Sequence, residues 1–393
     1  MKPTRTIRIA AVGDVALGGE FLERARPPGA PLTFPFAEID PILKRADLVL
    51  VNLEGPIGAE GPKRPGRTAL LHNHPEVLGW LASLPNCVCT LANNHTLDYG
   101  VDGLRRTMAL LDQHGIRHLG AGMDAKEASK PLRLHLNGID LALVGYTTDE
   151  IHVGSVLATE TEPGCNGLPD DATLRKEINT LAATSDGVIA LLHWGHEFHH
   201  FPTPRQVDCA HLLAEAGARL VIGHHPHVQQ GVQQIDRTLV CHSLGNLILP
   251  EMRAETGRVQ FRKKITKQFA ILDATVGAGA VNDWNVMGGR CARDFRLHSY
   301  AGPERKQFET LLTDLSAPLG RPGYAGFWAE YRDERVRSLK RESVREILPK
   351  LAQSDFKTLV RTFSPADLGR LTRRVTSLLT RKRSGHLRGG SIR

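Results

Sequence analysis

The chain has 393 residues, of which 41% are hydrophobic, 23% charged and 5% aromatic, and its formal net charge is +8. These values are ordinary for a soluble globular protein and allow either one large domain with an appendage or two domains, with a core that needs neither disulfides nor structural zinc. Six cysteines without a CxxC pair exclude a secreted disulfide framework and indicate reduced thiols in a cytoplasm.

The N-terminus reads MKPTRTIRIAAVGD, and its apolar part runs directly into a motif. Such a short apolar stretch does not fit a signal peptide, and removing it would destroy the first predicted strand. The chain has no run of about 18 apolar residues, which a transmembrane helix requires. The sequence therefore predicts a cytoplasmic protein without a membrane span.

Apolar runs rich in β-branched residues recur along the chain and predict buried strands. They lie at 7–14, 47–54, 87–94, 139–146, 187–195, 219–227, 238–246 and 268–276. Helical patterns fall between several of them, at 100–116, 169–184 and 204–218. Strands that alternate with helices predict an α/β fold with a sheet that is at least partly parallel.

The remainder of the chain is patterned differently. Residues 277–330 are Gly-rich and predict further strands and loops, whereas the sequence becomes helical and charged from about residue 331. We expect a main domain over 1–300, a helical basic extension over 301–383 and a disordered tail over 384–393. Residues 301–393 carry 20 Lys and Arg against 10 Asp and Glu. The basic helix predicted at 364–383 either docks on the domain or lies on an anionic surface.

Several predicted strands end in side chains that can bind metals. These are Asp14, Asn52, Glu54, Asn93, Asn94, His95, His193, His225 and His227. Each alone is explained as well by a helix cap or a core histidine. Together they predict a shared site, because ligands in α/β sheets gather beyond the carboxyl ends of the strands. Carboxylate, amide and imidazole ligands without a thiolate suit a binuclear centre of Mn, Fe or Zn.

The stretch VIGHHPHVQQ at 221–230 places histidines around Pro226. Because Pro226 biases the preceding residue toward extended geometry, we expect the side chains of His225 and His227 to share one face. His224 then alternates to the other face as a supporting residue.

Six motifs in the order GDVALGG, NLEGPI, LANNHTLDYG, HWGHEF, GHHPHVQQGV and HSLGNLI closely resemble those of the CapA family. That family is named for poly-γ-glutamate capsule synthesis and resembles a branch of the calcineurin-like metallophosphoesterases. The resemblance covers about residues 7–250. It implies an α/β fold, namely a four-layer α/β/β/α metallophosphoesterase sandwich with a two-metal site at the strand ends. In this chain the helical basic C-terminal extension would follow that sandwich.

The resemblance also implies a role for each site residue. Two divalent metal ions would be held by Asp14 and His227, by the bridging Glu54, and by Asn94, His193 and His225. His95 would act as the general acid and Asp98 would orient it. Glu197 and Asn246 would contact substrate at the rim. The implied reaction is attack of a metal-bound hydroxide on a phosphate ester.

Two departures from the pattern keep an alternative open. The first motif reads Asp14-Val15-Ala16 where the wider superfamily has Asp-x-His, and His242 replaces a tyrosine common in the family. The missing imidazole favours a non-catalytic or weakly catalytic module that binds an acidic polymer. The expected partners are thus a phosphorylated or acidic polymeric substrate and, through the basic tail, an anionic membrane. The 5% aromatic content and the lack of an RNA-binding signature argue against nucleic acid.

Overall fold

A computed structural model describes residues 5–18, 34–65, 70–148, 154–249, 252–253, 259–260, 264–277, 279–292 and 294–353. The chain forms two compact units. The first comprises Met1–Arg253 and Val259–Trp328, and the second comprises Ala254–Arg258 and Ala329–Arg393.

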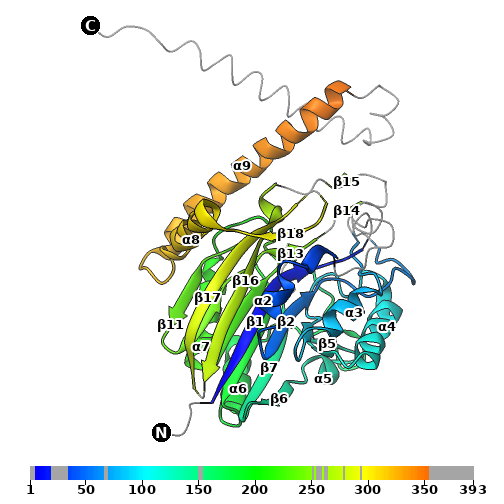
Figure 1. Ribbon diagram of the computed structural model, residues 1–393, viewed down its shortest axis with the longest axis vertical. Helices are drawn as coiled ribbons and strands as arrows, with labels where there is room; N and C mark the ends of the chain where they lie inside the picture. The colour runs from blue at the N-terminus through cyan, green and yellow to red at the C-terminus, as the bar shows by residue number, and fades with distance from the viewer. Residues whose placement is uncertain are drawn as a thin grey trace. The chain divides into compact units, whose positions relative to one another are not determined.

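The first sheet of the larger unit is antiparallel in one half and parallel in the other. Its order is β18 (Leu297–Ser299), β17 (Ala280–Cys291), β16 (Gln268–Gly277), β1 (Thr6–Val15), β2 (Leu48–Leu53), β3 (Val88–Thr90) and β4 (Arg117–Leu119). A short strand, β13 (Asn246–Ile248), also pairs in parallel with the end of β1. Strands β1 to β4 run parallel to one another, so their carboxyl ends share one edge. Figure 1 shows β17, β16, β1 and β2 side by side.

The second sheet has a parallel centre and antiparallel margins. Its order is β11 (Val232–Ile235), β12 (Thr238–Cys241), β10 (Ala218–His224), β9 (Gly187–His193), β7 (Ile139–Thr147) and β6 (Leu132–Leu136). Strands β12, β10, β9 and β7 are parallel neighbours. The carboxyl ends of β9 and β10 therefore bring their last residues to one edge of this sheet.

Alternating side chains divide the core into layers. On β1, Ile7 and Ile9 belong to a cluster that fills the space between the two sheets, whereas Val12 belongs to a cluster on the outer face of the first sheet. On β10, Ile222 points into the inter-sheet cluster and Val221 into a third cluster outside the second sheet. Strands buried on both faces are continuous apolar runs, which is why the sequence revealed them.

Helices cover both outer faces. The helices α2 (Asp40–Leu43), α3 (Val77–Ala82) and α4 (Gly100–Gln113) supply apolar side chains to the cluster outside the first sheet. The helices α6 (Asp171–Ala182) and α7 (Pro204–Glu215) do the same outside the second. This arrangement confirms the predicted four-layer α/β/β/α sandwich.

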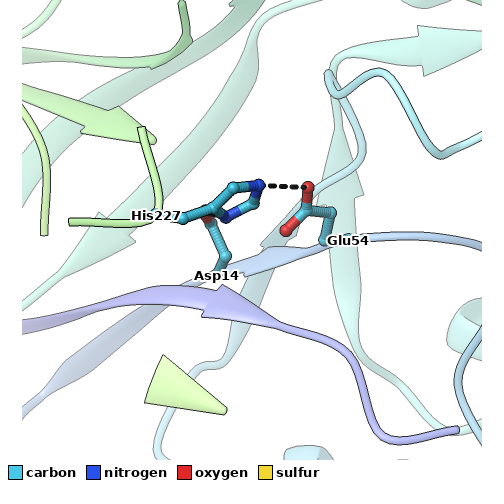
Figure 2. A group of neighbouring side chains, drawn as sticks. All are labelled: Asp14, Glu54 and His227. Atoms are coloured by element: carbon cyan, nitrogen blue, oxygen red, sulfur yellow. Dashed lines mark ion pairs between the residues drawn. The ribbon is translucent and has the colours of Figure 1, made fainter. Parts of the chain in front are cut away.

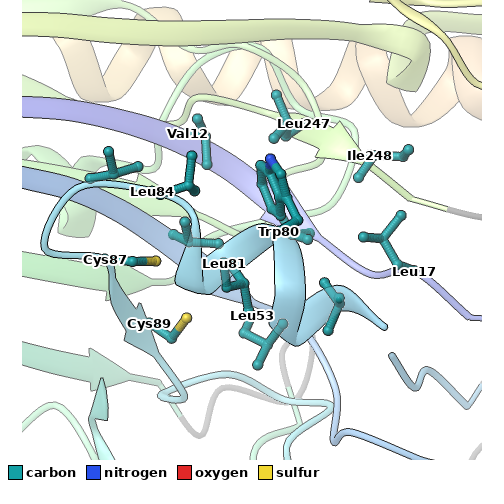
Figure 3. Close-up of a cluster of buried hydrophobic side chains, with 14 of the residues drawn as sticks. Val12, Leu17, Leu53, Trp80, Leu81, Leu84, Cys87, Cys89, Leu247 and Ile248 are labelled. Atoms are coloured by element: carbon teal, nitrogen blue, oxygen red, sulfur yellow. The ribbon is translucent and has the colours of Figure 1, made fainter. Parts of the chain in front are cut away.

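The outer core of the first sheet centres on Trp80 of α3, which lies among side chains from β1, β2 and β13 (Figure 3). Its ring stacks on Phe36 with centroids 3.8 Å apart. Its indole N–H donates to Asp40 Oδ1 at 3.0 Å, so the buried polar group of this large side chain has a partner.

Short elements complete the described chain. They are the 3-10 turns η1 (Phe34–Phe36) and η2 (Lys264–Lys267), the helix α5 (Ala125–Ala128), and the strand pairs β5 (Ala121–Gly122) with β8 (Gly164–Cys165) and β14 (Met252–Arg253) with β15 (Val259–Gln260).

The stretch predicted as strands and loops at 277–330 is only partly so. Strands β17 and β18 are present, but α8 (Gly302–Ser316) is a helix and α9 begins at Tyr324 and runs to Gln353. The spacing of Phe308 and Leu315, which are both buried, shows that α8 is amphipathic and that the overall glycine content concealed a local helical pattern. The domain boundaries expected from the sequence stay a prediction.

The basic helix predicted at 364–383 and the tail at 384–393 lie outside the described residues. Within the described residues, no helix combines the length and apolar character needed to cross a membrane.

Candidate functional site

The two sheets bring their polar strand ends to one place. Asp14 lies near the end of β1, Glu54 directly follows β2, His193 ends β9 and His224 ends β10. All four are buried, with at most 2% of their surface exposed. The gathering that the sequence predicted at the carboxyl ends of the strands is thus what the fold produces.

Asp14, Glu54 and His227 form one tight group, in which each offers a ligand atom within 4.8 Å of the others. His227 Nδ1 lies 3.1 Å from Asp14 Oδ2, and its Nε2 lies 4.0 Å from Glu54 Oε1. Figure 2 shows the imidazole reaching from its loop to the two carboxylates. Two carboxylates and one imidazole that converge on a buried point could hold a metal ion.

A second group of nitrogen and oxygen atoms forms where strand ends of the second sheet meet Asn94, which lies in the loop after β3 of the first sheet. His193 Nε2 lies 2.9 Å from Asn94 Oδ1 and 3.2 Å from His225 Nδ1. The rings of His193 and His225 have centroids 4.8 Å apart. An amide oxygen and two imidazole nitrogens therefore face one another. Atoms of these kinds are ligands for the same metals that the first group would suit.

Asparagine side chains hold the ligand candidates in place. Asn52 Nδ2 donates to Asp14 Oδ1 at 2.8 Å and lies 3.4 Å from His193 Nδ1. Asn246 Oδ1 lies 2.8 Å from His227 Nδ1. Such contacts to the non-coordinating atoms fix ring orientation and tautomer. From the sequence, Asn52 is expected at this edge, but no role is assigned to it. Its position two residues before Glu54 indicates that its side chain faces the same edge.

Electrostatics within the site differ between the two groups. Burial raises the pKa of Glu54 well above its ordinary value, and the charge of Asp14 adds to this. Burial lowers the pKa of both His193 and His225 well below that of a free imidazole, and neighbouring imidazoles lower it further. The second group is therefore held neutral, the form in which imidazole binds metals.

His227 behaves in the opposite way. Burial would lower its pKa, but the charges of Glu54 and Asp14 and the contact with Asp14 raise that pKa to about 10. Burial likewise opposes ionisation of Asp14, yet the hydrogen bond and charge of His227 keep the pKa of Asp14 below its ordinary value. A positive charge is thus stabilised between the two carboxylates.

The buried atoms left over fit divalent metal ions. Among the described residues, both carboxylate oxygens of Glu54 and the Nε2 of His225 have no hydrogen-bond partner. Buried polar atoms without partners are costly and usually mark a missing ligand or a functional site. The residues that would hold metal are Asp14, Glu54 and His227 on one side, and Asn94, His193 and His225 on the other.

The geometry expected for the histidine pair is wrong. Strand β10 ends at His224, and the φ angles of His225 and His227 are 95° and 58°, so neither residue is extended. The rings still approach, with centroids 5.8 Å apart. The bias that Pro226 places on its neighbour is local, and the tertiary contacts of a tight turn override it. His224 has the supporting role expected, with Nε2 3.2 Å from the Val12 carbonyl oxygen.

His95 and Asp98 lie beside this group. Nδ1 of His95 is 2.5 Å from Asp98 Oδ2, and Nε2 is 3.9 Å from Glu54 Oε1. The Leu71 N–H also donates to Asp98 Oδ2, at 2.8 Å. The carboxylate therefore orients the imidazole so that its far nitrogen faces the metal-ligand candidates, as an acid next to a reacting group requires.

Glu197 and Asn246, the two residues expected at the substrate rim, differ in their exposure to solvent. Glu197 is exposed, in the loop between β9 and α7. Asn246 is buried, and besides its contact with His227 it donates from Nδ2 to the Thr266 carbonyl oxygen at 3.2 Å. Their contact with substrate stays a prediction. His242 points elsewhere: its ring stacks on Trp194, with centroids 6.2 Å apart, and its Nε2 lies 3.3 Å from Gln233 Oε1.

Comparisons with known proteins indicate the family to which the chain is similar. The family model described as "Bacterial capsule synthesis protein PGA_cap" matches residues 8–251. The Capsule biosynthesis protein CapA of Bacillus anthracis is 29% identical over 251 residues, which cover 62% of this chain and 60% of that protein. The PGA biosynthesis protein CapA of Bacillus subtilis is 29% identical over 243 residues, covering 61% of this chain and 62% of its own length.

The chain thus spans about three-fifths of the length of these curated relatives. A hypothetical protein from Thermus thermophilus, known from its crystal structure, aligns over 75% of this chain and 100% of its own, with 15% identity and a TM-score of 0.44. The family match covers more than half of the chain and contains all the metal-ligand candidates. The chain therefore belongs to the bacterial capsule synthesis PGA_cap family, which confirms the resemblance to CapA.

Proposed function

We propose that this chain is a metal-dependent phosphoesterase that acts in the synthesis of an anionic capsule polymer such as poly-γ-glutamate. The observation that carries the proposal is the position of Glu54, a fully buried carboxylate grouped with Asp14 and His227 whose oxygens lack hydrogen-bond partners among the described residues. The capsule context rests on the names of the CapA relatives, and a fold alone does not fix a substrate.

Divalent ions of Mn, Fe or Zn, when bound, would neutralise a phosphoryl group and lower the pKa of water so that it attacks phosphorus. Asp14, Glu54 and His227 would hold one ion, and Glu54, Asn94, His193 and His225 the other. The low pKa of His193 and His225 supports this, because neutral imidazoles bind metals without first losing a proton.

His95 would protonate the leaving oxygen of the ester. Its Nε2 lies 3.9 Å from Glu54 Oε1, so a substrate held at the metal-ligand group would place its leaving oxygen within reach. Asp98, in contact with Nδ1 at 2.5 Å, would stabilise the ring in the orientation that directs Nε2 toward Glu54. Burial of both side chains keeps water from competing for the proton.

The experiment that tests the proposal pairs metal analysis with a substrate panel. Purified protein should hold about two Mn, Fe or Zn ions per chain and hydrolyse an aryl phosphomonoester or phosphodiester. Turnover should be lost when the metal is removed and should return when metal is added again. A protein that resists metal reconstitution, or that binds metal without hydrolysing any phosphoester, would contradict the proposal.

One observation favours a second candidate, a module that binds an acidic polymer without efficient turnover. Ala16 stands where the wider superfamily has a histidine, so the first metal group has a single imidazole, His227. Binding of poly-γ-glutamate by metal-loaded protein that hydrolyses no phosphoester would support this candidate.

We further propose that the basic C-terminal segment contacts an anionic membrane. Residues 364–393 carry eight Lys and Arg and a single Asp, a charge density that attracts anionic lipid headgroups. This contact would bring the site close to the membrane at which a capsule polymer is made and exported.

A further inference from the structure

The loop between β9 and α7, residues 194–203 and here called the rim loop, is tied to the segment that carries His225 and His227. The Phe198 N–H donates to the Pro226 carbonyl oxygen at 2.8 Å. The ring of Phe198 lies beside that of His227, with centroids 6.1 Å apart. A movement of the rim loop would therefore displace His227, a metal-ligand candidate.

The rim loop also holds a strained backbone. Phe198 has a φ of 64°, a left-handed conformation that a bulky L-residue rarely adopts. Such a conformation persists only where surrounding contacts enforce it, and it is concentrated at functional sites. Contacts from within the family region contribute, since Gln230 Nε2 donates to the His199 carbonyl oxygen at 2.8 Å.

Further contacts come from the first turn of α9. The Tyr324 hydroxyl donates to the Pro202 carbonyl oxygen at 2.7 Å. Phe327 packs edge-on against Phe201 with centroids 4.9 Å apart, and Trp328 lies against His196 at 5.8 Å. We call Tyr324, Phe327 and Trp328 the aromatic brace. Tyr324 and Trp328 are each only 8% exposed, so their contacts are buried, whereas Phe327 is 38% exposed.

The chain leading to the brace is anchored at the start of strand β11 of the second sheet. The Val232 N–H donates to Ser316 Oγ at 2.8 Å. A Cβ atom on Gly231 would lie 2.5 Å from the Leu315 carbonyl oxygen, so only glycine allows the end of α8 to approach this closely. The segment that precedes the aromatic brace is therefore held against Gly231 and Val232.

Polar side chains of the rim loop stand within electrostatic range of the site. The charge of Glu197 acts on both Glu54 and His227, and that of His196 acts on His225. Trp328 contacts the ring of His196, so the brace touches the part of the rim loop that carries these two side chains.

We propose that the aromatic brace is a positioning element of the site: Tyr324, Phe327 and Trp328 fix the rim loop beside His227, so that the loop borders the place where a phosphoryl group would bind. The brace lies beyond residue 251, where the family match ends, so a part of the chain outside the shared region helps to shape the site. That the bound group is a phosphoryl group rests on the proposed function, whereas the fixing of the rim loop does not.

The test compares full-length Trp328→Ala and Trp328→Phe with the matched control Trp284→Ala, since Trp284 is an exposed tryptophan on β17. Hydrogen exchange of metal-free protein would follow peptides that cover 194–203. Calorimetry with inorganic phosphate would follow binding by manganese-loaded protein, and elemental analysis would record manganese per chain. None of these readouts requires turnover.

We expect Trp328→Ala to speed exchange at Phe198 about tenfold and to weaken phosphate binding about tenfold, which corresponds to about 1.4 kcal/mol, with manganese content unchanged. Trp328→Phe should restore most of both, because a ring again packs on His196, and Trp284→Ala should behave as wild type. Unchanged exchange in Trp328→Ala would overturn the brace. Faster exchange with unchanged phosphate affinity would overturn its role in the site. Faster exchange in a protein whose wild type binds no phosphate would support the fixing of the loop and overturn the proposed function instead.

Discussion

His95 and Asp98 form a buried pair in which Nδ1 of the imidazole lies 2.5 Å from Oδ2 of the carboxylate. The pair is set by local sequence, because the Asp98 N–H donates to the His95 carbonyl oxygen in a single turn before α4 begins at Gly100. Nε2 is left facing Glu54. An imidazole held in this way presents one defined nitrogen to a substrate.

We expect His95→Ala to lower phosphoester turnover by at least about a hundredfold, the contribution typical of a general acid, while metal content stays at the wild-type value. Asp98→Asn should cost about tenfold to a hundredfold, because the ring loses the partner that orients it. Steady-state kinetics and elemental analysis check both. The control is His135→Ala, since the His135 side chain is 67% exposed. Turnover retained in His95→Ala would remove its assigned role.

The two ligand groups predict separable metal losses. His227→Ala removes the imidazole of the Asp14 group, and His193→Ala removes the nitrogen that faces Asn94 and His225. Each variant should lose about one of the two ions expected for a binuclear centre and keep the other. Elemental analysis after dialysis measures this directly. Loss of both ions in both variants would show that the ions bind only as a pair, and loss of neither would contradict the ligand assignment.

Glu54→Gln should reduce the stability that metal binding adds to the protein. In metal-free protein the substitution relieves the burial of a carboxylate but also removes one of the charges that stabilise protonated His227, so the free energy of unfolding should change little. With manganese present, the variant should gain far less stability than wild type, since it lacks the shared ligand.

Urea unfolding in chelator and in manganese would measure both effects. Glu60→Gln is the matched control, because the Glu60 side chain is 76% exposed in its ion pair with Arg106 and its loss should change stability little. Equal stabilisation of wild type and Glu54→Gln by manganese would exclude Glu54 as a ligand.

The sequence predicted the sandwich and the convergence of its polar strand ends because both follow from patterns along single segments. The run before Asp14 is apolar on both faces, and parallel strands carry their ends to a common edge. The left-handed φ angles of His225 and His227 could not be predicted, since contacts with the distant rim loop enforce them. The same holds for Tyr324, whose partner Pro202 is 122 residues away. The helix α8, by contrast, had a readable signal in the spacing of Phe308 and Leu315.

Deleting residues 364–393 should leave hydrolysis of a small aryl phosphoester unchanged and weaken binding to anionic lipid vesicles. The deletion removes eight basic residues, each contributing about 1 kcal/mol near an anionic surface, so affinity should fall more than tenfold at low salt. Vesicle sedimentation with neutral vesicles as reference measures this. Deleting only 384–393 removes two of the eight and should have a smaller effect. Equal vesicle binding by both deletions and wild type would contradict a membrane role for the segment.

His242 predicts a dependence of stability on pH that is independent of metal binding. It is fully buried, and burial, with a smaller effect of His211, lowers its pKa to about 3, whereas an unfolded chain has a histidine pKa of about 6.5. Between these values the unfolded chain binds a proton that the folded chain does not. The stability contributed by neutral His242 is therefore complete above about pH 6.5 and falls by about 1.4 kcal/mol for each pH unit below it.

His242→Tyr keeps a ring against Trp194 and removes this titration. Relative to wild type, the variant should therefore gain about 2 kcal/mol in free energy of unfolding between pH 6.5 and pH 5. Urea unfolding of metal-free protein at a series of pH values measures the difference, and His135→Gln, at an exposed histidine, should follow the wild-type profile. If His242→Tyr instead lost stability toward acid as steeply as wild type, the acid sensitivity would have to come from the other buried imidazoles, His193, His224 and His225, whose pKa values burial also lowers.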